Sequence, residues 1–447
     1  MVVGATETDP TSSGPRLSIL IHSIYYDASA TGIAKYTAEL AEWLAARGHR
    51  VEVITTPPHY PSWRIASAYR GVGYKRERLA GVDVCRTPLY VPAADRLSGR
   101  RRILYEASFA VNGVYWWLRA LLRRPRHDLV VAVCPSLQSA WMPWVYATLR
   151  RVPWLLHVQD LQVDTALRLG IIGTGGFGRV MYELEAFLMG RATSVSTITE
   201  AMRQRIVAKG VLESRTVLFP NWSDVGFIRP LPRGNELRRG LGVPLDHTLF
   251  VYAGNMGAKQ GLELILAAAD RLRHQSELHL ALVGDGAVRA QLQAEAARLG
   301  LPRLHFLPLQ PVERLPELLA AADVHLVVQK REAADLVMPS KLVNVLAAGR
   351  PTIATADPGT ALHAVLADHA TGLVTPPGDV HAFVRAMTRL HGDPGMRTAM
   401  GRRARAFAER HFDKERILLD FEAVAARLAL YRPGGRTATE QQGAGVS

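Results

Sequence analysis

ADLVMPSKLVNVLAAG, residues 334–349, has the pattern of a loop that turns into an amphipathic helix. Pro339 disfavours the helical conformation for Met338, and Ser340 is a residue type that commonly caps a helix N-terminus. Gly349 then closes the segment, as glycine does at many helix ends. The apolar side chains between these signals recur at helical spacing: Leu342, Val343, Leu346 and Ala347.

The first turn of this predicted helix offers a place for an anion. Backbone N–H groups and the positive end of the helix dipole favour negative charge there, and Lys341 adds a full positive charge. Asn344 lies one turn further along on the face of Ser340, so its carboxamide is placed to bind a hydroxyl of the molecule that carries the phosphate. A nucleotide sugar fits this description. The alternative is an ordinary capped helix on which Lys341 and Asn344 are simply solvated.

Size and composition indicate a two-domain globular protein. The chain has 447 residues, of which 48% are hydrophobic and 21% charged, and a single core rarely serves so long a chain. Cys85 and Cys134 lie far apart and lack metal-binding spacing, so we expect buried free thiols. The net charge of +14 indicates an anionic partner, which nucleic acid, an anionic membrane surface or an anionic small substrate would each satisfy.

The two ends of the chain predict tails and no membrane span. Residues 1–15 are small, polar and acidic, and the apolar run at 17–24 is too short and wrongly flanked for a signal peptide or a span. We therefore expect a cytoplasmic protein with disordered tails at residues 1–15 and 432–447.

The first half of the chain predicts a doubly wound α/β domain over residues 16–228. A buried-strand pattern at 17–25, an amphipathic helix at 32–47 and a strand at 51–55 form a βαβ unit. Its glycine-bearing turn, ASATGIAKY, follows the first strand, where open parallel sheets bind their ligands. The turn lacks a G-x-G-x-x-G pattern, which counts against a nicotinamide or flavin enzyme. Further strands alternate with helices near residues 82–86, 129–133, 154–158, 193–197 and 216–220.

The second half predicts another domain of the same class. A segment rich in Pro, Arg and Gly at residues 229–246 is expected to be a linker, followed by a second Rossmann-like domain at 247–412. A last helix at 413–431 is predicted to pack back on the first domain. The expected strands of the second parallel sheet are residues 250–254, 278–284, 304–307, 324–328 and 351–354.

Residues 96–126 depart from this alternation. RLSGRRRILYEASFAVNGVYWWLRALLRRPR brackets an aromatic-rich apolar stretch with two arginine clusters, as a helix at a membrane surface does. Such a helix would lie on an anionic membrane, and we expect Trp116 and Trp117 to take part in the contact. A sheet-covering helix with solvated ends is the alternative. Nucleic-acid binding is disfavoured, because the aromatic residues gather in one helix and no RNA-binding signature is present.

Taken together, these pieces resemble the retaining GT-B glycosyltransferases of the family 4 type, and within it the exopolysaccharide and colanic acid biosynthesis enzymes. The likeness runs from residue 17 to about residue 431. It implies two doubly wound Rossmann-like domains facing across a cleft. The stretches that carry it are TGIAKYTAELAEWLAARGHRVEVIT, HVQDLQVD, FPNWSD, YAGNMGAKQGLELIL, LVGDG, MPSKLVNVLAAGRPTIAT and GLVTPPGD.

The resemblance also implies roles for individual residues. Gly32 would line the cleft beneath the donor diphosphate, Asn255 and Lys259 would face that diphosphate, and Gln310 or its neighbours would lie near the base. His157 and Asp160, after a first-domain strand, are candidates for orienting the acceptor hydroxyl, with a buried strand-end histidine as the alternative for His157. Catalytic candidates are His157, Asp160 and Lys259. The implied donor-binding residues are Gly32, Gly254, Asn255, Lys259, Gln310, Asp335, Met338, Pro339, Ser340, Lys341 and Asn344.

The chain departs from the family pattern in its central stretch. Many relatives have an arginine where this chain has Asn255, and a pair of glutamates where it has Leu336 and Asn344; Asp335 is one position away from the first. A catalytically degenerate nucleotide-sugar-binding subunit is therefore an alternative, and a nucleotide-sugar epimerase is another.

The resemblance implies transfer with retention and without a metal or other cofactor, and the sequence has no D-x-D motif for a diphosphate-bound metal. The expected partners are a nucleotide-sugar donor, a saccharide or lipid-linked saccharide acceptor, and an anionic inner-membrane surface contacted through residues 96–126; nucleic acid is not expected.

Overall fold

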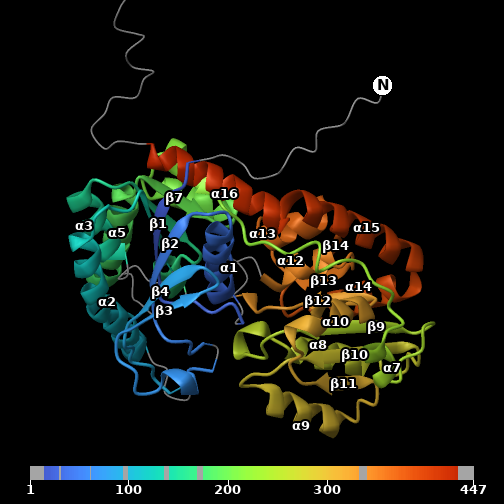
Figure 1. The fold of residues 1–447 in the computed structure, drawn as a ribbon. Helices are drawn as coiled ribbons and strands as arrows, with labels where there is room; N and C mark the ends of the chain where they lie inside the picture. The colour runs from blue at the N-terminus through green and yellow to red at the C-terminus, as the bar shows by residue number, and fades with distance from the viewer. Residues whose placement is uncertain are drawn as a thin grey trace, which may run out of the picture. The chain divides into compact units, whose positions relative to one another are not determined.

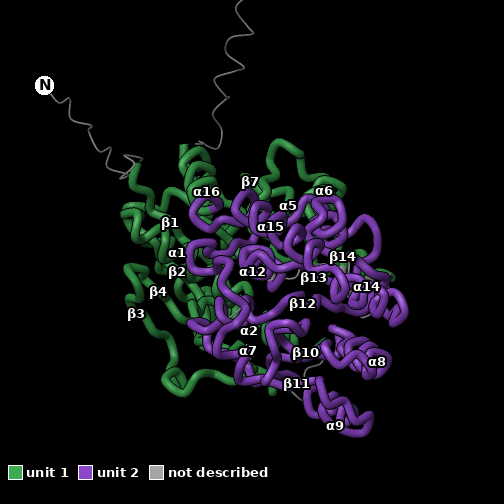
Figure 2. Tube along the Cα trace, turned by 90° about the vertical axis from the view of Figure 1, so that its right-hand side faces the viewer, with its two compact units in different colours: residues 1–198, 202–219, 418–447 green, residues 199–201, 220–417 purple. Residues whose placement is uncertain are grey.

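The computed structural model describes residues 15–29, 32–60, 62–93, 99–134, 140–168, 175–331 and 340–430. The chain divides into two compact units, which Figure 2 shows in different colours. Unit 1 contains residues 1–198, 202–219 and 418–447, and unit 2 contains residues 199–201 and 220–417. The predicted tails, residues 1–15 and 432–447, lie outside the described residues apart from residue 15.

Unit 1 is built on a twisted eight-stranded sheet in the order β3-β4-β2-β1-β5-β6-β7-β8. All neighbouring strands pair in parallel except β3 and β4, which are antiparallel. The chain winds outward in both directions from β1, as in doubly wound folds. The strands are β1 (Ser18–Ser23), β2 (Arg50–Thr55), β3 (Lys75–Leu79), β4 (Val82–Arg86), β5 (Leu129–Cys134), β6 (Trp154–Val158), β7 (Ser194–Thr197) and β8 (Thr216–Leu218).

Helices cover both faces of this sheet. Helices α2, α3 and α5 lie along one face and α1 lies on the other (Figure 1). Alternate strand residues such as Leu20, Val130 and Leu156 pack against Trp117 of α2 and Tyr146 of α3, because side chains alternate between the two faces of a strand. The helices are α1 (Ile33–Ala46), α2 (Gly99–Leu122), α3 (Trp141–Arg150), α4 (Gln162–Arg168), α5 (Gly176–Arg191) and α6 (Glu200–Ala208).

Unit 2 is built on a six-stranded parallel sheet in the order β11-β10-β9-β12-β13-β14. Numbered within the unit, this is the 3-2-1-4-5-6 order of dinucleotide-binding folds. Its strands are β9 (Thr248–Ala253), β10 (Leu278–Val283), β11 (Leu304–Leu307), β12 (Val324–Val327), β13 (Thr352–Thr355) and β14 (Gly372–Thr375).

Two apolar layers hold the second sheet. Phe250 and Leu280 face a cluster with α8 and α14, whereas Val251 and Ala281 face another with α7 and α10. Leu342 and Leu346 of α12 pack with Ala404 of α15. The helices are α7 (Glu236–Gly240), α8 (Glu263–Arg271), α9 (Arg289–Leu299), α10 (Leu315–Ala321), α12 (Ser340–Ala347), α13 (Ala361–His363), α14 (Val380–Gly392) and α15 (Pro394–His411). Helix α16 (Lys414–Ala429) starts in this unit and continues into unit 1.

Residues 229–246, for which the sequence predicts a linker, pack into unit 2. Helix α7 lies within them, Leu237 joins an apolar cluster, and the buried Arg238 donates a 2.7 Å hydrogen bond to Asp323. The division between the units falls at Phe219 and Pro220 instead. The buried ion pair of Arg238 with Asp323 holds residues 229–246 against unit 2. The Pro and Gly content of this segment gives no indication of such a pair.

Helix α16 begins in unit 2 and belongs to unit 1 from Leu418 onward. There Glu422 accepts hydrogen bonds from Arg47 and pairs with His49 at 2.8 Å. These contacts lower the pKa of the Glu422 carboxyl, because its charged form is stabilised by both partners against the cost of burial.

Two further expectations concern the thiols and the membrane. Cys85 and Cys134 are buried and free, which confirms the prediction. Every helix in the described part of the chain is too short or too polar to span a bilayer.

Candidate functional site

The carboxyl ends of β9 and β12 meet at the point where the strand order of unit 2 reverses. Open α/β sheets bind their ligands at such a switch point. Gly254 and Asn255 directly follow β9, and Lys330 comes shortly after β12. Helix α12, which carries Lys341 and Asn344, also lies between β12 and β13 in the chain. The topology therefore assigns these residues to the same edge of the sheet.

Two glycine-bearing turns cross in contact at this edge. Gly254 follows β9 with a φ of 145°, and Gly284 follows β10 with a φ of 140°. A Cβ on Gly284 would lie 2.0 Å from the backbone oxygen of Gly254, and a Cβ on Gly286 would lie 2.4 Å from that of Met256. Only glycine permits this approach. The crossing keeps backbone, rather than side chains, beside the switch point.

The ammonium of Lys341 lies beside the turn that contains Gly254. Its ammonium nitrogen lies 4.0 Å from the centre of the Tyr252 ring, and a Cβ on Gly254 would come within 3.3 Å of it. In the described part of the chain no carboxylate lies within salt-bridge distance of this ammonium. Burial lowers the pKa of Lys341 to about 7, because removal of water disfavours the charged form of the ammonium. A bound anion would supply a counter-charge.

Asn344 is oriented by a residue from another part of the chain. The hydroxyl of Ser223 donates a 2.8 Å hydrogen bond to Asn344 Oδ1. Ser223 is itself fixed by backbone hydrogen bonds with Phe412 and Lys414. With its carbonyl so engaged, the amide Nδ2 of Asn344 is the group left to donate to a hydroxyl oxygen.

The remaining predicted residues of unit 2 surround this core. Asn255 and Lys259 are exposed, and Lys259 lies in a single 3-10 turn. The backbone carbonyl of Lys259 accepts a 2.9 Å hydrogen bond from the backbone N–H of Lys330. That bond ties the turn after β9 to the end of β12. Gln310 follows β11, one strand beyond β10, and its side chain donates to its neighbour Pro308 at 3.0 Å. In the described structure Gln310 forms no hydrogen bond with Lys341, Tyr252 or Asn344.

Some predicted donor-binding positions lie outside the described residues. These are Asp335, Met338 and Pro339, which fall between the described residues 331 and 340. The structure gives Ser340 as the first residue of α12.

The predicted residues of unit 1 lie at the carboxyl edge of the other sheet. Gly32 precedes α1 with a φ of 66°. His157 is the fourth residue of β6 and is 3% exposed. Its Nδ1 lies 2.9 Å from the Ser196 hydroxyl and its Nε2 2.9 Å from the Gln159 amide. Burial lowers the pKa of His157 to about 3, so the ring is neutral at physiological pH. Asp160 lies just after this strand and is partly exposed.

The sequence analysis missed three residues of the unit 2 site. Tyr252 presents its ring to Lys341, Ser223 orients Asn344, and Lys330 adds a cation at the end of β12. A lysine three residues after a buried strand was a signal for Lys330. Tyr252 and Ser223 contact Lys341 and Asn344 only in the folded structure, so no local sequence pattern predicts them.

The structure also bears on a metal site. The described residues contain no group of three or more His, Cys, Asp or Glu side chains placed to hold a metal ion.

Comparison with known proteins gives a consistent result. Residues 31–222 match the glycosyl transferase 4-like domain, and residues 234–407 match glycosyl transferases group 1. The chain is 40% identical over 412 residues to WcaI of Escherichia coli strain K12, named as a colanic acid biosynthesis glycosyl transferase; the match covers 91% of this chain and 98% of that protein.

Solved structures share the fold at lower identity. Sucrose-phosphate synthase from Thermosynechococcus elongatus matches with a TM-score of 0.71 at 20% identity, over 92% of this chain and 99% of that one. HepE from Anabaena, in complex with UDP, matches with a TM-score of 0.68 at 17% identity, over 92% and 100%. The predicted GT-B class, with two Rossmann-like α/β units, is confirmed.

Proposed function

Because the chain belongs to the glycosyltransferases that join a 4-like domain to a group 1 domain, we propose that it moves a sugar from a nucleotide-sugar donor to a saccharide acceptor, with retention of anomeric configuration. The product belongs to an exopolysaccharide or cell-envelope glycan, by analogy with the name of its colanic acid relative. The observation that carries the donor assignment is the ammonium of Lys341, which packs on the Tyr252 ring and has no carboxylate partner among the described residues.

In this proposal the donor diphosphate lies against Lys341 and the glycine crossing. The ammonium and backbone N–H groups then balance its charge in a partly dry site. Lys259 stabilises the leaving group, and Asn344 donates to a ribose hydroxyl. Asp335, Met338, Pro339 and Ser340 complete the donor site, as the family resemblance implies.

The proposed reaction breaks the bond between sugar C1 and the diphosphate oxygen. The acceptor oxygen bonds to C1 on the same face, and the acceptor proton passes to a phosphate oxygen of the leaving nucleoside diphosphate. No metal is assigned a part, which follows from the lack of a D-x-D motif in the sequence; unchanged activity after EDTA treatment would support this. Asp160 and His157 orient the acceptor hydroxyl, so unchanged transfer in both His157→Ala and Asp160→Ala would refute that role.

A contact with an anionic membrane surface through α2 is also part of the proposal. Apolar side chains spaced by seven, four, three and four residues form one exposed stripe of this helix. Its members, 40% to 84% exposed, are Leu104, Val111, Tyr115, Leu118 and Leu122. The guanidinium of Arg119 lies 5.7 Å from the centre of the Tyr115 ring, and further arginines follow the helix in the sequence. This chemistry fits anionic lipid, and it favours a lipid-linked acceptor.

The predicted part of Trp116 and Trp117 in that contact is wrong, because both side chains are buried. Trp117 is fully covered, and Trp116 donates a 3.1 Å hydrogen bond to the Arg86 backbone oxygen. The variant that tests the contact is therefore Leu118→Ser/Leu122→Ser. We expect the parent protein to float with anionic liposomes and this variant not to float; a parent protein that stays unbound would refute the contact.

The transfer itself is tested with radiolabelled nucleotide sugars and a lipid extract from the source cells. We expect label from one donor to become soluble in organic solvent, and Lys341→Met to prevent this. Donor binding without any transfer would favour the degenerate binding subunit, and conversion of the donor without an acceptor would favour the epimerase.

A further inference from the structure

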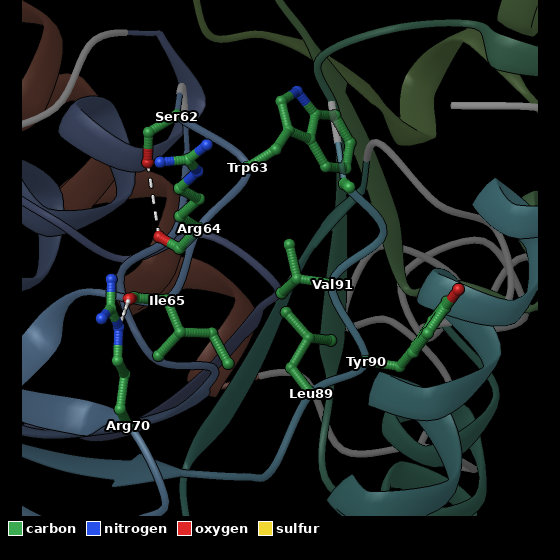
Figure 3. Close-up of a pocket in the computed structure, with 9 residues that line it drawn as sticks. Ser62, Trp63, Arg64, Ile65, Arg70, Leu89, Tyr90 and Val91 are labelled. Carbon is green, nitrogen blue, oxygen red and sulfur yellow. Dashed lines mark hydrogen bonds between the residues drawn. The ribbon is translucent and has the colours of Figure 1, made fainter. Parts of the chain in front are cut away.

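A pocket of about 800 Å³ opens at the carboxyl edge of the unit 1 sheet. It is formed by residues 62–65 and 70, which follow β2, and by residues 89–91 and 93, which follow β4. Figure 3 shows Ile65, Leu89 and Val91 converging on its middle, with Arg64 and Arg70 along one side. Neither the donor site nor the membrane contact uses any of these residues. The volume is that of a site for a small molecule.

The floor of the pocket is apolar and firmly held. Leu89 belongs to a buried cluster with Tyr105 and Phe109 of α2, and the partly buried Val91 packs against this cluster. Trp63 stands at another side (Figure 3), and its ring packs 5.4 Å from that of Tyr105. These contacts fix the walls before any ligand arrives, and binding then requires little ordering of the protein.

Trp63 has an unusual backbone conformation. Its φ of 52° lies in the left-handed region, which a bulky side chain seldom adopts. Such strain persists only where the surroundings impose it, and it concentrates at ligand sites. Here it holds the indole beside the apolar floor.

The charged residues among the described lining of the pocket, Arg64 and Arg70, are both cationic. Neither has a carboxylate partner among the described residues. The only hydrogen bond of these guanidinium groups in the described structure runs from Arg70 Nε to the Ile65 backbone oxygen at 3.3 Å. Arginine forks match the oxygens of a phosphate group. The pocket therefore combines a phosphate-binding side with an apolar floor.

We propose that this pocket binds the phosphate or diphosphate group of an isoprenoid-type lipid, with the first carbons of its chain on Ile65, Leu89 and Val91. The inference rests on the proposed transferase function and names the anchor of its acceptor. The loop that forms the pocket is bonded to α2, because Asn112 Nδ2 donates to the Pro88 oxygen at 3.0 Å and Ser108 Oγ accepts from Tyr90 N at 3.1 Å. The exposed stripe of α2 thus offers an apolar surface near the pocket for the rest of the chain.

The test is calorimetric titration of the full-length protein with farnesyl diphosphate, a short and water-soluble isoprenoid diphosphate. Inorganic diphosphate and a uronic-acid disaccharide are titrated in parallel. The variant is Arg64→Gln/Arg70→Gln, and the control is Arg78→Gln, which removes an exposed arginine of β3 outside the pocket. Each arginine contact with a phosphate should be worth about tenfold in affinity.

We expect saturable binding of farnesyl diphosphate that weakens at least about tenfold in the double variant and stays unchanged in Arg78→Gln. Inorganic diphosphate should bind more weakly, because it leaves the apolar floor uncovered. Binding that ignores the double substitution, or an Arg64- and Arg70-dependent preference for the uronic-acid disaccharide, would overturn the proposal. A nucleotide-sugar titration separates the two conclusions: donor binding without farnesyl diphosphate binding refutes this inference alone, whereas loss of both refutes the proposed function as well.

Discussion

The ammonium of Lys341 lies 4.0 Å from the centre of the Tyr252 ring, within the first turn of α12 and at the end of β9. The ring face attracts a cation, although by less than a carboxylate would. Burial of this ammonium costs folding free energy, and the lowered pKa of Lys341 reflects that cost. An anionic ligand bound at this position would offset that cost, because it stabilises the charged ammonium. The stability of unit 2 is therefore linked to donor binding.

Replacing Lys341 by methionine should stabilise the unliganded protein. The folded pKa of about 7 lies below the ordinary lysine value of 10.5, so the unfolded chain binds more protons between those pH values. The charge therefore lowers the free energy of unfolding at neutral pH. A gain on the order of 1 kcal/mol would raise the melting temperature by roughly 2 to 4 °C for a domain of this size. Lys35→Met is the control: Lys35 of α1 is partly exposed and its ammonium lies 3.8 Å from the Glu39 carboxylate, an exposed type of pair that contributes little, so the melting temperature should change little. A lower melting temperature in Lys341→Met would contradict the assignment.

Donor affinity should depend on pH through the same group. Below about pH 7 Lys341 is protonated before binding, and the affinity should be constant. Above pH 7 binding must also take up a proton, so the affinity should fall by up to about tenfold per pH unit. The dissociation constant measured from about pH 6 to about pH 9 checks this. Lys341→Arg stays charged throughout, and a variant profile as steep as that of the parent protein would speak against Lys341 as the titrating group.

The glycine crossing should be intolerant of any side chain. In Gly284→Ala the new Cβ would lie 2.0 Å from the Gly254 oxygen, and we expect a loss of stability on the order of 3 kcal/mol together with loss of donor binding. Gly300→Ala is the matched control, because its φ of 61° is also positive but nothing lies within 4 Å of its Cβ. It should cost only about 1 kcal/mol. Equal losses in urea-induced unfolding would show that the contact with Gly254 has no part.

The Ser223 and Asn344 pair can be tested by a double-mutant cycle. Asn344→Ala should weaken donor binding about tenfold, because a ribose hydroxyl loses its donor. Ser223→Ala should weaken it less, since the carboxamide loses only its orientation. Calorimetric titration of the double variant should then match Asn344→Ala alone. Additive losses would mean that Ser223 acts on the donor independently of Asn344.

Most of the fold could be predicted from the sequence because parallel strands are buried on both faces. Continuous apolar runs such as those of β5 and β10 are bounded by turn residues and stand out locally. β3 was not predicted, since KRERL is polar and mostly exposed at the sheet edge. The prediction of a linker at residues 229–246 failed because the buried pair of Arg238 and Asp323 joins positions far apart in the chain, which local composition does not show.

The candidate site was predictable only in part. The cation at the start of α12 and the amide one turn later follow from local spacing, so Lys341 and Asn344 could be named. Their partners Tyr252 and Ser223 lie far from them in sequence and come together only through the tertiary fold. Trp116 and Trp117 were predicted to contact a membrane but are buried. An aromatic pair between arginine clusters has the same local pattern in both cases, so the sequence could not decide between them.

The most direct test of the donor site is a thermal-shift panel of the parent protein and Lys341→Met against UDP-, GDP- and ADP-sugars, because a ligand that binds the native state raises its melting temperature. We expect one nucleotide class to raise the melting temperature of the parent protein and to leave that of Lys341→Met unchanged. An equal rise in both proteins would place the donor away from Lys341. No rise with any nucleotide sugar at millimolar concentration would contradict donor binding by this chain.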